Sequence, residues 1–260
     1  MYNFDSKNHI HLIDKKPAMG TSSVVGIISK PLTWWAAGKA VEIFGWKNPK
    51  KHSPEECTET AQNALETIKT LEVGEYVQLL KKAYYAHSEA KDIAAEGGTD
   101  LHSLLESYVM DCLENNDGIP LAHNPNEDKR ISDFIDWSLE NVEHFIASEV
   151  NTYSIKKWIG GIVDCVAKMK DGKTAIIDFK SSKEAYESQF VQVAGYDIQL
   201  REKGGYTPEG EKILKLIKAD EYIIIPFGAK KFEPVYRYNT KQLRACFTSA
   251  LRIYKLNNHI

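Results

Sequence analysis

Residues 160–182, of sequence GGIVDCVAKMKDGKTAIIDFKSS, constrain the fold more than any other stretch of this chain. Two apolar runs rich in β-forming residues, 162–169 and 174–179, flank the tetrapeptide KDGK at 170–173. Asp-Gly between two such runs is a hairpin-turn signal. The two runs are therefore predicted to be antiparallel neighbours at the centre of a sheet.

Two carboxylates lie within the apolar runs of this hairpin. Asp164 follows Ile-Val and Asp178 follows Ile-Ile, so both are expected on paired strands. Whether they share a face depends on the register, which the sequence leaves open. If they converge, two hard oxygen ligands suit Mg²⁺ or Mn²⁺. The alternative is that Asp178 and Lys180 form an ordinary ion pair at the end of an exposed strand.

Lys180 is predicted to share a strand face with Asp178, because side-chain direction has period two. An ammonium beside a metal ion would orient or activate an attacking water, or offset charge on a phosphate oxygen. If the ion binds there, Lys180 is expected to lie next to it.

Composition excludes several classes of protein. The chain has 260 residues, 27% of them charged and 43% hydrophobic, and a formal net charge of −3. This charge neither indicates nor excludes a nucleic-acid binder, because a basic groove can be local. Four cysteines lie far apart without a CxxC pair, which favours reduced thiols over a zinc site or disulfides. No apolar run approaches the ~20 residues of a membrane span, and no targeting segment is recognisable. We expect a cytoplasmic, intracellular protein with no membrane partner.

The N-terminal part is predicted to be mainly helical after a short hairpin within residues 1–20. Ser22 and Ser23 are expected to cap an apolar stretch, and Pro31 to mark the start of a helix containing Leu32, Trp34 and Trp35. The two tryptophans are either core residues or a stacking platform for unpaired bases. A capping box of Ser53 and Glu56 predicts a helix to about residue 71, and a further helix covers 75–89.

A strongly amphipathic helix is predicted from Thr99, whose side chain is a good N-cap. His102 then falls in the first turn, where the positive end of the helix dipole would keep its imidazole neutral and available for ligation. The alternative is a satisfied structural histidine. Residues 115–127 form a polar loop, and we place the boundary there: 1–127 as an N-terminal helical region packed on the core, and 128–260 as the core itself.

The core begins with a predicted helix over 128–150, whose apolar face is continued by Glu149. A strand over 152–158 follows, and Gly160-Gly161 turns the chain into the central hairpin. A helix over 185–203 presents Gln192 and Tyr196 on one face. With a strand over 221–227, the order is helix, three strands, helix, strand: an α/β fold with a mixed sheet flanked by helices.

The motifs GGIVD, IIDFKSS and QVAGY (192–196), with Glu149 upstream, resemble the PD-(D/E)XK nuclease superfamily, in particular its RecB-like and phage exonuclease branch. The resemblance is most specific over residues 98–196, and αβββαβ is the core order of that superfamily. It implies metal ligation by Asp164, Asp178, the backbone carbonyl of Phe179, Glu149 and His102, with Lys180 as the catalytic lysine. It also implies substrate contacts from the following residues: Gln192, Tyr196, Trp35 and Ser181. The sequence has Asp178 where many members carry Glu, and both residue types ligate metals.

The resemblance thus implies a Mg²⁺- or Mn²⁺-dependent deoxyribonuclease, most simply an exonuclease acting on single- or double-stranded DNA ends in recombination, repair or phage DNA processing. Its N-terminal helical region would cover the site and admit a strand end. The clustered C-terminal cysteines of iron–sulfur members are missing, so no such cluster is expected. The alternatives are an endonuclease of the same fold, and a nucleic-acid-binding protein that retains the fold without cleavage.

Overall fold

The computed structural model describes residues 1–29, 33–123 and 131–259, without the side chains of 91–100. The chain divides into two compact units, residues 1–29 with 98–260, and residues 30–97. These limits differ from the sequence-based boundary at residue 127, because both chain segments next to the second unit pack on the sheet of the first. The predicted helix start at Pro31 and the Leu32 position lie outside the described residues.

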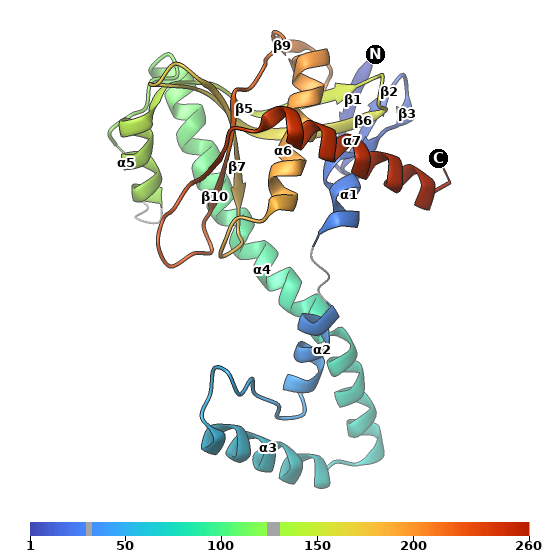
Figure 1. Cartoon of the computed structure of the whole chain (residues 1–260). Helices are drawn as coiled ribbons and strands as arrows, with labels where there is room; N and C mark the ends of the chain where they lie inside the picture. Colours follow the sequence, from blue (N-terminus) through green and yellow to red (C-terminus); the bar gives the residue numbers. More distant parts are fainter. Residues whose placement is uncertain (30–32, 124–130, 260) are drawn as a thin grey trace. The chain divides into compact units, whose positions relative to one another are not determined.

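The first unit is built on a mixed sheet (Figure 1), with strand order β11-β10-β7-β6-β5-β8-β9 and with β4 paired to β6. Neighbours β5, β6 and β7 are antiparallel, whereas β10 is parallel to β7 and β4 is parallel to β6. The strands of this sheet are β4 (Met19–Gly20), β5 (Val142–Ser154), β6 (Ile159–Met169), β7 (Thr174–Lys180), β8 (Gly205–Tyr206), β9 (Lys212–Leu214), β10 (Glu221–Pro226) and β11 (Val235–Arg237). A small antiparallel sheet contains β1 (Tyr2–Asp5), β2 (Ile10–Ile13) and β3 (Lys16–Pro17).

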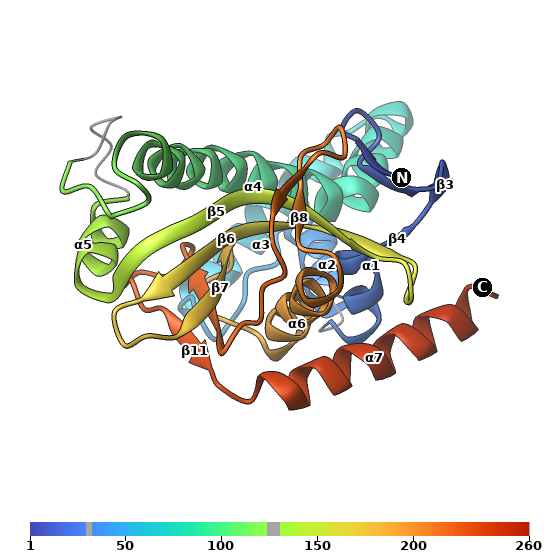
Figure 2. The same cartoon turned by 90° about the horizontal axis from the view of Figure 1, so that it is seen from above.

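Helices cover both faces of the large sheet, as Figure 2 shows from above. One face packs against α6 (Glu187–Glu202), α7 (Thr240–Asn257) and α1 (Thr21–Val25). The other packs against α5 (Ser132–Asn141) and the C-terminal part of α4 (Val73–Asn115). Ile176 belongs to the first core and Ile177 to the second, as the alternation of side chains along a strand requires. The expected mixed sheet flanked by helices is confirmed.

The central hairpin forms as predicted. β6 and β7 pair through Cys165 with Ile177 and through Lys168 with Thr174. Gly172 adopts a φ of +87° in the turn, and its N–H donates to the carbonyl of Met169 over 2.9 Å. Glycine adopts this left-handed backbone conformation without the steric penalty that a Cβ would bring. The strand pairing is therefore set by the local Asp-Gly turn.

The predicted helix over 128–150 is correct over residues 132–141 and wrong from Val142 onward. Residues 124–130 lie outside the described part, α5 ends at Asn141, and β5 begins at Val142. Two register irregularities in the β5–β6 ladder, near His144 and near Ala147, break the alternation of buried side chains. Buried positions then fall three, two and three residues apart, a spacing that imitates a helix. Glu149 consequently lies on a strand and not on the first core helix.

Gly160 and Gly161 do not make the predicted turn, because they lie inside β6. The turn between β5 and β6 is made earlier, where Trp158 has a φ of +59°. A Cβ on Gly160 would lie 2.4 Å from the His11 side chain, and one on Gly161 would lie 2.6 Å from the Tyr196 ring. Because the two glycines have no side chains, β2 and α6 can pack closely against β6.

Helix boundaries upstream follow the sequence only in part. The capping box of Ser53 and Glu56 is present at the start of α3 (Pro54–Lys69), which confirms that prediction. The helix expected from Thr99 does not start there, because α4 runs unbroken past this position. Helix α1 begins at Thr21 and has no side-chain cap, so the expected serine caps are wrong. The short 3₁₀ turn η1 (Gly26–Ile28) and α2 (Thr33–Glu42) complete the helices upstream of α3. No helix in the described ranges has both the length and the apolar character needed to cross a membrane.

Candidate metal centre

Three acids occupy one row across three neighbouring strands. Glu149 on β5 and Asp164 on β6 lie between the paired positions Ser148–Cys165 and Val150–Val163. Asp178 on β7 lies one residue beyond the β6–β7 pair formed by Cys165. Opposed residues of antiparallel strands lie close together. The register that the sequence left open therefore places these carboxylates side by side.

His102 on α4 completes a cluster with two of these acids. Its Nε2 lies 3.2 Å from Asp164 Oδ2, and its Nδ1 lies 3.8 Å from Glu149 Oε1. One ligand atom from each of His102, Glu149 and Asp164 lies within 4.8 Å of the others. The edge of the imidazole contacts the ring of Phe179, with centroids 5.7 Å apart. One imidazole and two carboxylates, all partly exposed, form a donor set suited to a divalent ion.

Asp178 lies beside this three-residue cluster but does not join it. Its side chain is only 1% exposed and forms an ion pair of 2.6 Å with the Lys180 ammonium, as the shared strand face predicts. The backbone N–H of Phe179 donates to Asp164 Oδ2 over 2.8 Å, which holds this carboxylate between the cluster and β7. Metal ligation by Asp178 and by the Phe179 carbonyl remains a prediction.

Three carboxylate oxygens of the site are buried without a hydrogen-bond partner among the described residues: Glu149 Oε1 and both oxygens of Asp178. Of these, Asp178 Oδ2 still forms the ion pair with the Lys180 ammonium. Burial, followed by the charge of Asp164, raises the pKa of Glu149 to about 8. Burial likewise raises the pKa of Asp178 to about 7, against the opposing charge of Lys180. Burying these carboxylates costs free energy, which a bound cation would offset. The residues therefore fit a divalent ion.

The protonation of His102 differs from the sequence-based expectation. A hydrogen bond to Asp164 raises the pKa of His102, with the charges of Asp164 and Glu149 acting in the same direction. The dipole argument for a neutral ring is wrong because His102 lies inside α4 rather than in its first turn. Neutral imidazole, the ligating form, therefore requires a cation to replace the proton.

Lys180 is an ammonium in this arrangement. Burial lowers its pKa, but the charges of Asp178 and Asp164 outweigh burial and raise it above the ordinary value. A protonated lysine donates hydrogen bonds and offsets negative charge, and it does not accept a proton. Of the two roles expected from the sequence, the structure favours positioning over deprotonation of the nucleophile.

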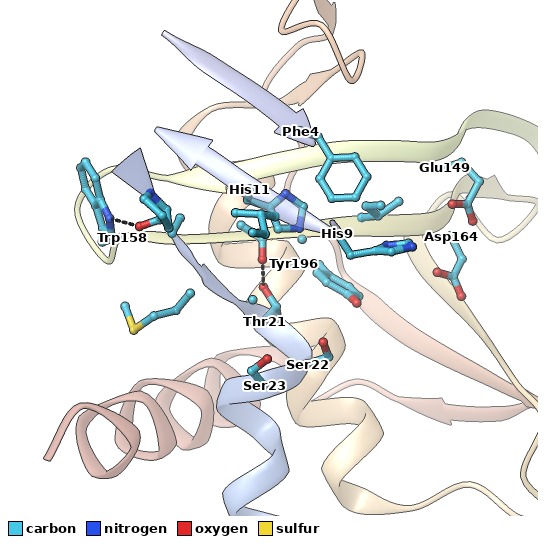
Figure 3. Close-up of a pocket in the computed structure, with 18 of the residues that line it drawn as sticks. Phe4, His9, His11, Thr21, Ser22, Ser23, Glu149, Trp158, Asp164 and Tyr196 are labelled. Carbon is cyan, nitrogen blue, oxygen red and sulfur yellow. Dashed lines mark hydrogen bonds between the residues drawn. The ribbon is translucent and has the colours of Figure 1, made fainter. Parts of the chain in front are cut away.

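The cluster opens into a cavity of about 710 Å³, shown in Figure 3, where the carboxylates of Glu149 and Asp164 lie near the Tyr196 side chain. One wall comes from the N-terminal strands, including His11, and from Thr21. Thr21 Oγ1 donates to the carbonyl of Gly160 over 2.9 Å and accepts from Gln199 over 2.6 Å. Sequence analysis missed this wall, although a Gly-Gly pair in a β-rich run is a signal of close backbone approach.

Only some of the predicted substrate-binding residues lie at the cavity. Gln192 donates to Tyr196 Oη over 2.6 Å, and Tyr196 lines the cavity. Ser181 is exposed directly after β7. Trp35 lies on α2 in the second compact unit, next to Trp34, which is 89% exposed and is therefore not a core residue. Substrate binding by Trp35 and Ser181 stays a prediction.

Comparison with known proteins does not assign the chain to a family. No protein-family model matches it, and no curated protein sequence matches it. The argument for its function therefore rests on the residues of the site and on their geometry.

Glu149 is expected to make the metal-free protein less stable as pH rises. Folding raises the pKa of this carboxyl group from 4.5 to about 8. The group therefore costs no folding free energy below pH 4.5, where it is protonated in both states, and its destabilising effect is complete above about pH 8. Asp178 and His102, whose pKa values are also raised, change stability in the same direction. In EDTA, Glu149→Gln should melt close to the unmodified protein near pH 4.5 and several degrees above it at pH 8. Scanning calorimetry across this range tests the assignment, and parallel melting curves would contradict it.

Proposed function

We propose that this chain is a Mg²⁺- or Mn²⁺-dependent deoxyribonuclease that hydrolyses phosphodiester bonds from strand ends. The observation that most supports this proposal is that His102, Glu149 and Asp164 converge next to the Asp178–Lys180 ion pair. The resemblance of the hairpin motifs to PD-(D/E)XK nucleases supports the same reaction. An ammonium beside a divalent-ion site is the arrangement that phosphate chemistry needs, because both offset the charge of the reacting phosphate.

Each residue has a defined part in this proposal. His102, Glu149 and Asp164 would hold the ion, and the N–H of Phe179 would keep Asp164 oriented. When bound, the ion would act as a Lewis acid on the phosphate. Asp178 holds Lys180 in position, and the Lys180 ammonium donates a hydrogen bond to the attacking water or to a phosphate oxygen.

Tyr196 provides a second donor at the same cavity. Burial, with the charge of Asp178, raises the pKa of Tyr196, so its hydroxyl stays protonated. Because Gln192 donates to Tyr196 Oη, the phenol proton is free to bind a phosphate oxygen. The pair thus serves substrate binding, as the resemblance implies.

The size of the cavity favours strand ends. At about 710 Å³ it matches pockets that enclose small ligands. The end of an unpaired strand fits a space of this volume. The fit supports a preference for single-stranded or frayed ends and, with it, an exonucleolytic mode of cleavage.

Linear single-stranded DNA is expected to be degraded from its ends while covalently closed circles of the same sequence persist. The experiment compares end-labelled linear and circular DNA, single- and double-stranded, at equal nucleotide concentration with Mg²⁺, Mn²⁺ or EDTA. Cleavage should require the metal and should slow as salt rises, because phosphate contacts release counterions.

Two other outcomes discriminate the alternatives. Equal cleavage of circles and linear strands would make the protein an endonuclease and contradict end selection. Metal-independent DNA binding without cleavage of any substrate would support a binding protein that keeps the nuclease-like arrangement, and would overturn the proposed activity.

A further inference from the structure

A second cavity, of about 810 Å³, lies away from the metal cluster between α6, α7 and the β5–β6 turn. Five cationic side chains line it, against one lining carboxylate, Glu202; the cations are Lys156, Lys157, Arg201, Arg244 and Arg252. The chain as a whole carries a formal net charge of −3. This concentration of positive charge is therefore a local feature of the fold and not a consequence of composition.

Two of the cations are held rigidly at the cavity. Arg201 and Arg244 both bond the carboxylate of Asp197, over 2.8 Å and 2.6 Å, and Asp197 is fully buried. The hydroxyl of Tyr222 also donates to this carboxylate. Two guanidinium groups share one carboxylate, so one positive charge is uncompensated. Oriented guanidinium groups with remaining N–H donors suit the oxygens of phosphate.

The other three cations are free of carboxylates. Lys156, Lys157 and Arg252 form no ion pair among the described residues. Glu202 forms no ion pair with the lysines; its oxygens accept from Ser154 and from the backbone N–H groups of the β5–β6 turn, and its single negative charge is outnumbered by the lining cations. The cavity therefore presents an excess of positive charge to solvent.

Three elements, α6, α7 and the β5–β6 turn, contribute residues to both the basic cavity and the metal cavity. In the β5–β6 turn, Lys157 lines the first and Trp158 lines the second. On α6 the corresponding neighbours are Ile198 and Tyr196, and α7 likewise contributes to both cavities. A polymer long enough to pass around these elements would contact both cavities, which a small anion cannot do.

We propose that the basic cavity binds the phosphate backbone of the DNA strand whose end occupies the metal centre. This inference rests on the proposed nuclease function and adds to it a binding surface outside the catalytic site. Such a surface retains the strand between successive cleavage steps. Its contribution is electrostatic and does not depend on base sequence.

The test is the salt dependence of DNA binding in EDTA, measured by fluorescence anisotropy with a long and a short single strand. Lys156→Glu/Lys157→Glu is the test variant, and Arg201 and Arg244 stay unchanged because they neutralise a buried carboxylate. Lys168→Glu/Lys170→Glu is the matched control: it changes the charge equally at the other end of β6, about 35 Å along the strand. Equal melting temperatures establish that both variants fold.

The test variant should bind the long strand at least ~10-fold more weakly, and the slope of log K against log[salt] should fall by about 1.4, or ~0.7 for each lost phosphate contact. The control should match the unmodified protein, and turnover of the short strand should be unchanged in both variants. Unaltered binding by the test variant would overturn the inference while leaving cleavage intact. Loss of binding to vesicles of anionic lipid, without loss of DNA binding, would overturn it in favour of a membrane surface. If the unmodified protein cleaves no DNA, the nuclease proposal fails, and the binding comparison still decides this inference.

Discussion

Asp164→Asn is expected to abolish metal-dependent cleavage and to weaken Mn²⁺ binding by more than ~100-fold, since even the partners of metal ligands contribute about 10–100-fold. Asp164 contacts both the histidine of the cluster and the backbone of β7. It lies 3.2 Å from the imidazole of His102 and accepts the N–H of Phe179 over 2.8 Å. The amide keeps the shape of the side chain but removes its charge, so the loss reports on electrostatics rather than on packing.

Calorimetry with Mn²⁺ and a cleavage assay on the same preparation measure the two effects. Asp171→Asn is the matched control, because it makes the same chemical change in the exposed turn at the other end of β6. The control should bind metal and cleave DNA as the unmodified protein does. Unchanged Mn²⁺ affinity in Asp164→Asn would remove this residue from the metal site.

Lys180→Ala is expected to lower turnover by on the order of 10³-fold while leaving Mn²⁺ affinity within about threefold, the size of effect seen when one preorganised donor is removed. The reason is that the ammonium interacts with charge that develops during the reaction, whereas the ion is held by other side chains. Lys180→Arg should restore little activity, because the guanidinium is larger and has a different donor geometry.

Single-turnover kinetics with saturating metal separate the chemical step from binding. Lys183→Ala, in the exposed loop three residues further on, controls for a general loss of positive charge near β7. Near-normal turnover in Lys180→Ala would exclude this lysine from the mechanism. A parallel loss of metal affinity would instead show that Asp178, left without its ion partner, disturbs the ligands.

Features that depend on neighbours in sequence were predictable. The Asp-Gly turn sets the pairing of β6 with β7, and period two puts Asp178 and Lys180 on one face. The apolar pattern and loop signals located α6, with Gln192 and Tyr196 one turn apart. In each case a few adjacent residues carry the whole physical cause, so no distant contact is needed to decide the outcome.

The position of Glu149 was not predictable in the same way. Its spacing from Val142 and Phe145 is helical, yet the segment forms β5 because it completes the sheet beside β6. The irregularities that produce this spacing exist only when the two strands are paired. Local pattern and tertiary pairing therefore favoured different structures, and pairing prevailed.

The hairpin and the positions of Asp164, Asp178 and Lys180 on it were determined by the sequence alone, because turn chemistry and strand alternation are local. Strand register decided that the carboxylates converge, and Glu149 joins them only through the pairing of β5 with β6. Tertiary structure decided which groups surround them. The N-terminal wall exists because β4 pairs with the first residues of β6, far away in the sequence. The proton on His102 is held because α4 brings the ring to Asp164. Both depend on distances between residues far apart in the chain, and a charge interaction falls off with distance in space and not with separation in sequence.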